Sequence, residues 1–273
     1  MNDEMDKPAD QPEEWQAPPL PEEIIAEVEE PQMSEVETLF GIFMEPGKTF
    51  EDLRRKPRFI LAFVITALFA SVMVIGMQWK LGEERIKSFT ISQIEKNPQM
   101  ASASKAQVEQ SAAIGLKIQK VITYLTPLLL LIITAIGALF YWVGSLALGG
   151  KGKFGHALST WVYSSLPPAV VGVILNGIVL LLKNADDIDI ATSQRGLIRA
   201  NLGILVDGKA HPVLATLLGT FDVFAIWGVV LAAIGLRITT KLSSASSWAV
   251  VLFLTLIGVA FRVLGAFFNG IPS

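Results

Sequence analysis

The sequence contains no cysteine and only two histidines among its 273 residues. Without cysteine there is no disulfide, no thiolate zinc site and no cysteine nucleophile. His156 and His211 lie in different predicted loops, and neither has a second ligand at the spacing of a metal site. The hydrolase and metalloprotease patterns G-x-S-x-G and H-E-x-x-H do not occur. We therefore predict a protein that is not an enzyme and that has no cofactor.

Charge is also scarce, because 17% of the residues are charged, compared with about 25% in soluble domains. The first forty residues hold thirteen acids and a single base, Lys7, so the remainder of the chain is basic although the formal net charge is −3. Hydrophobic residues make up 52% of the sequence. For this apolar, basic remainder we expect the lipid bilayer, and no nucleic acid, as the partner.

Residues 1–33 combine these acids with six prolines. Such a segment buries too little apolar surface to offset the entropy of ordering, so we predict a disordered acidic tail. An alternative, motivated by Trp15 and Ile24-Ile25, is a docking peptide for protein partners. The segment is acidic and has no apolar stretch, which excludes a secretory signal peptide.

Residues 34–56 predict short amphipathic helices beside the membrane. Ser34 and Glu37 have the S-x-x-E pattern of a capping box, and Pro46-Gly47 ends the first helix. Four basic residues within 54–58 follow directly. Two locations remain open: the membrane surface, or a packed position on the protein's own bundle. The apolar stripe of the first helix consists of Val36, Leu39, Phe40 and Phe43.

Five long apolar stretches occupy residues 57–273. Each has twenty-one or more residues, enough to cross a hydrocarbon core of about 30 Å. The fold class is therefore an all-α, polytopic integral membrane bundle with about five transmembrane helices. In the third stretch, Pro167 and Pro168 predict a break, either a kink or an interfacial helix followed by a shorter span. The predicted spans are 59–79, 121–147, 157–182, 212–236 and 248–268.

The orientation is predicted from basic residues in short connections. Lys151 and Lys153 lie in one such connection, and Arg237 and Lys241 lie in another. Neither connection contains an acidic residue. Together with the basic cluster at 54–58, they favour a cytoplasmic location for this side. We therefore predict a cytoplasmic N-terminus and an external C-terminus.

Two ionisable residues, Asp222 and Arg262, lie inside predicted spans. A charge at the bilayer centre costs about 2.5–3.5 kcal/mol on insertion scales. We hypothesise that the two form an ion pair between the fourth and fifth spans. The alternatives are an arginine that extends outward alone, or a role in transport or proton relay.

Glycines recur seven residues apart in three of the spans, which places both members of each pair on one helix face. Small residues allow helices to approach closely in a membrane. We predict helix-packing seams within the bundle, with a homo-oligomer interface as the alternative. The pairs are Gly137 and Gly144, Gly228 and Gly235, and Gly258 and Gly265.

The order and spacing of three segments resemble the Ypt-interacting protein (Yip) family, in its prokaryotic branch. These are F-x-x-P-x-x-T-F at 43–50, W-V-Y-S-S-L-P at 161–167, and D-x-F-x-I-W at 222–227. The resemblance covers roughly 39–268 and implies five spans, a cytoplasmic N-terminus and, for a prokaryotic member, the bacterial inner membrane. Eukaryotic members bind Rab-type GTPases in membrane traffic. This chain lacks the Asp-Leu-Tyr-Gly-Pro stretch that those members carry, so GTPase binding is not transferred.

The function predicted from these features is a non-catalytic membrane scaffold that organises membrane or protein partners. The alternative is a small transporter or channel component that uses Asp222 and Arg262. Asn176 and the proline pair in the third span motivate this alternative, because broken helices and buried charges mark substrate paths.

Overall fold

The computed structural model describes residues 30–97, 100, 102–191, 193, 196–198 and 200–272, so the predicted tail lies almost wholly outside the described residues. The described elements belong to one unit, Pro31–Ser273, and are helical apart from an isolated bridge between Asn201 and Asp222. The predicted all-α membrane bundle is confirmed. The helices are α1 (Glu35–Met44), α2 (Pro46–Arg55), α3 (Ile60–Leu81), α4 (Glu83–Lys96), α5 (Lys105–Tyr124), α6 (Thr126–Ala147), α7 (Phe154–Leu182), α8 (Pro212–Gly219), α9 (Val223–Thr239) and α10 (Ser244–Asn269).

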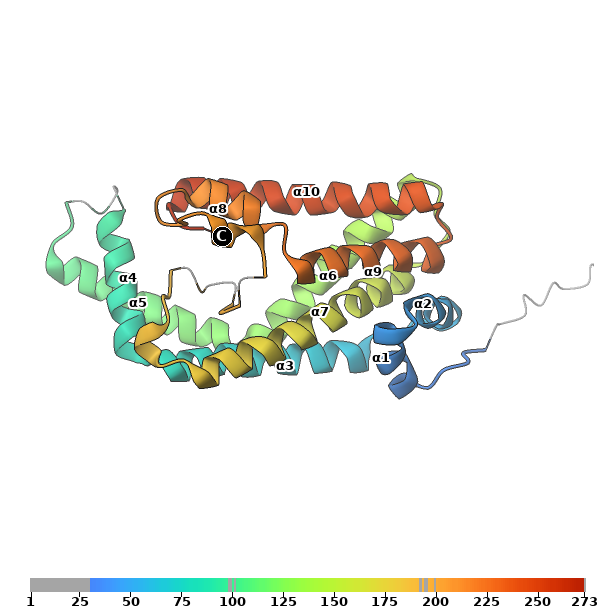
Figure 1. The fold of residues 1–273 in the computed structure, drawn as a ribbon, viewed down its shortest axis with the longest axis horizontal. Coiled ribbons are helices and arrows are strands. Elements are labelled where there is room, and N and C mark those ends of the chain that lie inside the picture. The colour runs from blue at the N-terminus through green and yellow to red at the C-terminus, as the bar shows by residue number, and fades with distance from the viewer. Residues whose placement is uncertain are drawn as a thin grey trace, which may run out of the picture. The chain divides into compact units, whose positions relative to one another are not determined.

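Four of the described helices, α3, α6, α7 and α10, are long and apolar enough to cross a membrane. The central one is α7, which packs against α3, α6 and α9. Helix α9 is apolar but has only 17 residues, which span about 25 Å. Figure 1 shows α1 and α2 at one end of these helices and the α4–α5 hairpin at the other.

The fourth predicted span, 212–236, is not one continuous helix. Helix α8 ends at Gly219 and α9 begins at Val223, with Asp222 as the N-cap of α9. The carboxylate of Asp222 accepts hydrogen bonds from the backbone N–H groups of Phe224 and Ala225, at 2.9 and 3.2 Å. A short acidic side chain competes with helical hydrogen bonds inside a helix but satisfies free N–H groups at its start. The chain therefore begins a new helix at this aspartate.

The second membrane-spanning helix starts at Thr126, five residues after the predicted start at 121. The structure ends α5 at Tyr124 and starts α6 at Thr126, with Pro127 in its first turn. Proline fits a first helical turn because its missing N–H has no partner there in any case. The long connection before this span forms α4 and α5, which pack against each other.

The third span is a single helix of 29 residues that continues through Pro167 and Pro168. Of the two alternatives, the structure contains the single long helix and not an interfacial helix followed by a shorter span. A proline at 168 cannot donate to the carbonyl of Ser164, four residues earlier. Gly228 of α9 lies beside this carbonyl and beside the Pro168 ring: a Cβ at Gly228 would be 3.7 and 3.6 Å from them.

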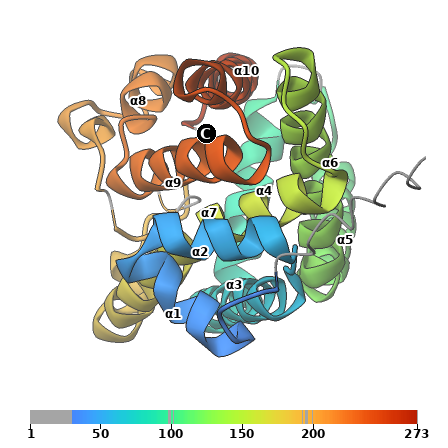
Figure 2. The same cartoon turned by 90° about the vertical axis from the view of Figure 1, so that its right-hand side faces the viewer.

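Residues 34–56 form α1 and α2, which pack on the bundle as a cap (Figure 2). Phe50 and Leu53 of α2 are fully buried in a cluster that includes Tyr163 of α7. The predicted Ser34–Glu37 capping box is present. Of the two locations left open, packing on the bundle is thus the one that the structure contains.

Candidate functional site

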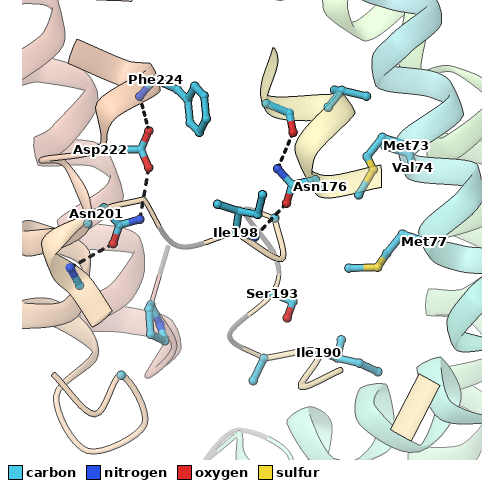
Figure 3. A pocket seen from close by; sticks show the side chains of 18 of the residues that line it. Met73, Val74, Met77, Asn176, Ile190, Ser193, Ile198, Asn201, Asp222 and Phe224 are labelled. Carbon is cyan, nitrogen blue, oxygen red and sulfur yellow. Dashed lines mark hydrogen bonds between the residues drawn. The ribbon is translucent and has the colours of Figure 1, made fainter. Parts of the chain in front are cut away.

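A cavity of about 940 Å³ lies where α9 begins (Figure 3). Its walls come from α3 and α7 on one side and from α8, α9 and α10 on the other, and residues of α4, α5 and the segment 190–208 complete the lining. Asp222 and Arg262, the two charged residues predicted inside spans, both line it. The other polar side chains of the lining are Gln78, Thr90, Gln119, Asn176, Ser193, Asn201 and Thr216.

Asp222 connects the start of α9 to the segment before α8. One carboxylate oxygen caps α9, and the other accepts a hydrogen bond from the side-chain amide of Asn201 at 3.3 Å. The two residues also form a β-bridge, and the N–H of Val223 donates to the carbonyl of Ala200 at 3.1 Å. The negative side chain is stabilised here by the positive end of the helix dipole.

Asn176 of α7 holds the same segment from the opposite wall. Its side-chain oxygen accepts hydrogen bonds from the N–H groups of Leu197 and Ile198, at 2.5 and 3.0 Å. Its amide nitrogen donates to the carbonyl of Gly172, one turn earlier, at 2.7 Å. Non-helical backbone at membrane depth occurs where protein groups satisfy it or where it lines a cavity. Asn176 satisfies two backbone N–H groups of this segment, and Ile198 and Asn201 of the same segment line the cavity.

The walls away from these polar groups are apolar and include several small or flexible side chains. Met73, Val74 and Met77 line the cavity from α3, and Ala169 and Gly172 line it from α7. A Cβ placed on Gly172 would meet nothing within 4 Å. The small residues keep the space open, and methionine side chains adapt to different shapes.

The hypothesis of an Asp222–Arg262 ion pair stays a prediction. The structure brings both residues to one cavity, on α9 and α10. Within the part of the chain that the structure describes, the Asp222 carboxylate accepts hydrogen bonds from the first turn of α9 and from Asn201. Capping explains the position of this aspartate without an ion pair.

The six glycines differ in what faces them. A Cβ on Gly137 would lie 2.3 Å from the Trp161 ring, and one on Gly235 would lie 2.6 Å from Thr160. Gly144 likewise faces Val250, at 2.9 Å. A Cβ on Gly228 would make only ordinary van der Waals contacts, and a Cβ on Gly258 would meet nothing within 4 Å. The packing role of Gly265 stays a prediction.

A second polar cluster lies in the cap, and sequence reasoning missed it. Asp52 is 1% exposed and forms an ion pair with Arg58. It also accepts hydrogen bonds from the backbone N–H groups of Gln32 and Met33, at 2.5 and 3.0 Å, while Arg58 donates to the Met33 carbonyl at 2.7 Å. Gln32 and Met33 are therefore held on the cap, although the predicted tail extended to residue 33.

Two further contacts hold the cap on α7. The hydroxyl groups of Thr38 and Tyr163 are 3.1 Å apart. His156 accepts from the N–H of Lys153 through Nδ1 and lies 3.0 Å from the Arg54 carbonyl through Nε2. Because Nδ1 accepts, the proton is on Nε2, which donates to that carbonyl. His156, predicted to be merely a polar loop residue, thus joins α2 to α7.

The chemistry available at the cavity is recognition by hydrogen bonds, one carboxylate and one guanidinium. Among the residues that the structure describes, no three His, Cys, Asp or Glu side chains gather as a metal site. An apolar cavity with a few convergent polar groups is the usual form of a small-molecule site.

Comparisons with known proteins agree with this architecture. The family model described as Yip1 domain matches residues 40–267. The membrane protein YknW of Bacillus subtilis (strain 168) is 29% identical over 245 residues, which are 88% of this chain and 94% of that protein. No solved structure matches. Because the family model covers most of the chain, from the end of α1 to the end of α10, this integral membrane protein belongs to the Yip1 domain family.

Proposed function

We propose that this Yip1-domain protein is a non-catalytic membrane scaffold that organises protein partners or the bilayer through its N-terminal region. The observation that carries the proposal is the fixed attachment of Gln32 and Met33 to Asp52 on the packed cap. A segment anchored in this way keeps whatever it binds close to the membrane surface, which raises the effective concentration of that partner.

The outer face of α1 supports the same proposal. Val36, Phe40 and Met44 are spaced four residues apart and are 57%, 71% and 82% exposed. Apolar side chains in a row on an otherwise polar cap suit the boundary between head groups and acyl chains. The cap would then touch the bilayer with α1 while α2 holds it on the bundle.

The test is a pull-down of the full chain from detergent, after cross-linking in membranes. It is compared with a variant that lacks residues 1–30 and with one in which the acids of those residues are changed to Asn or Gln. We expect a specific partner with the full chain and loss of that partner with both variants. Recovery of the same proteins in all three samples, or of none, would contradict scaffolding through this region.

A second candidate, a transporter or channel component, is favoured by the cavity around Asp222. Half-helices that begin inside the bundle, with non-helical backbone beside them, are typical of substrate sites in transporters. The break between α8 and α9 and the segment held by Asn176 have this form. A pH-sensitive dye trapped in proteoliposomes would report proton flux under an imposed potential. Flux that is lost in Asp222→Asn would favour this candidate, and equal flux in empty liposomes would exclude proton movement.

A further inference from the structure

We infer that the cavity at the start of α9 binds a long-chain amine, an amphiphile with an apolar chain and one protonated ammonium group. The inference rests on the cavity of the second candidate function but requires no transport. The carboxylate of Asp222 would receive the ammonium group, and the walls from α3 and α7 would contact the chain.

The first argument is the charge of Asp222. This residue is about 25 Å from the far end of α9, by the rise of 17 helical residues, and therefore lies within or at the edge of the hydrocarbon core. Its hydrogen-bond donors are two backbone N–H groups and the Asn201 amide, all of them neutral. The Arg262 guanidinium also lines the cavity, but the hydrogen bonds to the Asp222 carboxylate come from neutral groups, so a cation brought to this carboxylate would stabilise its charge.

The second argument is the space beside the carboxylate. A carboxylate has about four lone-pair positions, and three are used by the donors just named. Among the residues that the structure describes, none uses the fourth, which faces a cavity that Asp222 lines. An ammonium group is compact and can donate three hydrogen bonds, so it can also reach the side chain of Asn201, which lies beside Asp222.

The third argument is the shape of the apolar part. Lining residues on α3 extend from Ala70 to Leu81, about 16 Å along the helix. Beside them, Ala169, Gly172 and Val173 of α7 line the same side of the cavity with small or short side chains, which leave room for a chain along this wall. Methionines 73 and 77 allow chains of different lengths to fit.

The experiment uses two photoreactive probes of equal chain length, a primary amine and a fatty acid, each with a diazirine at the same carbon. The full chain is labelled in detergent, and labelled residues are identified by mass spectrometry. We expect the amine to label 70–81 and 168–173 at least fivefold more than the acid does. Labelling by the acid that equals or exceeds labelling by the amine would overturn the inference.

Two pairs of variants make the result specific. Asp222→Asn keeps a capping side chain and should reduce amine labelling at least fivefold, whereas Asp186→Asn, at an exposed position outside the cavity, should not. Gly172→Leu fills the cavity and should reduce labelling by the amine. Gly177→Leu places the same side chain in open space on the same helix, outside the lining, and should not. Undiminished labelling in both cavity variants would also overturn the inference.

Competition identifies the source of the ammonium group. Excess phosphatidylethanolamine that removes labelling points to a membrane lipid with an ammonium head group, while removal by octylamine alone points to a free amine. If neither compound removes the labelling, the labelling is adventitious, and this outcome contradicts the site. The pull-down described above does not involve the cavity, so its outcome is independent of this one.

Discussion

At the scale of single residues, Asp222 combines two roles, a helix cap and a negative charge in the cavity, and substitution separates them. Replacement of a capping Asp by Ala costs about 1 kcal/mol, whereas Asn caps about as well as Asp. We expect Asp222→Ala to lower the thermal unfolding temperature in detergent and Asp222→Asn to leave it nearly unchanged. Equal losses in both variants would mean that the charge, and not the cap, stabilises this point of the fold.

Asp52 gives a second prediction at this scale. Its removal leaves Arg58, whose side chain is 13% exposed, without its partner. Breaking a buried ion pair from one side costs about 3–5 kcal/mol. We expect Asp52→Ala to lower the unfolding temperature and to expose residues near Met33 to limited proteolysis. The double variant with Arg58→Met should lose less stability than the sum of the single variants. Additive losses would show that the two side chains act independently.

The capping box of α1 predicts a dependence on pH. The backbone N–H of Ser34, and then its hydroxyl, hold the pKa of the Glu37 carboxyl below its ordinary value. A lowered folded-state pKa stabilises the fold above the unfolded value, about 4.3, and this stabilisation is lost as the pH falls through the folded value. Protection of the first turn of α1 in hydrogen exchange, corrected for intrinsic rates, should therefore decrease below pH 4. Glu37→Gln keeps the hydrogen bond and should remove this dependence.

At the scale of helices, the sequence predicts helix boundaries best where hydrophobicity alone determines them. Helices α3 and α10 are long apolar runs, and their ends lie within a few residues of the predicted spans. The split between α8 and α9 was missed because the apolar run continues across it, and a single polar side chain starts the new helix. The roles of Asn176 and Asp52 depend on partners far away in sequence. No local pattern contains that information.

The glycines of α9 give a prediction at the same scale. Gly228 and Gly235 are seven residues apart on one helix, but a Cβ would lie 3.6 Å from its nearest neighbour at the first and 2.6 Å at the second. Overpacking costs about 1–3 kcal/mol, while Ala in place of Gly favours a helix by up to about 1 kcal/mol. We expect Gly235→Ala to destabilise the protein in detergent and Gly228→Ala to be neutral or stabilising. The reverse order would show that α9 does not pack against Thr160 of α7 in the membrane as closely as it does here.

At the scale of the whole chain, the three basic segments used to predict orientation gather at one end of the helices. His156 of α7 contacts the carbonyl of Arg54, and the N–H of Lys151 donates to the carbonyl of Thr240 at 2.8 Å. The connections before α3, α7 and α10 therefore share one side. Because the three connections share one side, the positive-inside rule predicts the same location, the cytoplasm, for all of them.

The side on which these segments lie can be measured directly, because the native sequence has no cysteine to interfere. Ser102 lies between α4 and α5, and Ser244 begins α10 near the basic connections; both are exposed. With the basic side in the cytoplasm, a membrane-impermeant maleimide added to intact cells should label Ser102→Cys and leave Ser244→Cys unlabelled until the cells are opened. Labelling of Ser244→Cys in intact cells would reverse the orientation. It would place Asp222 and its cavity on the cytoplasmic half, where an amine ligand would have to arrive from the inner leaflet.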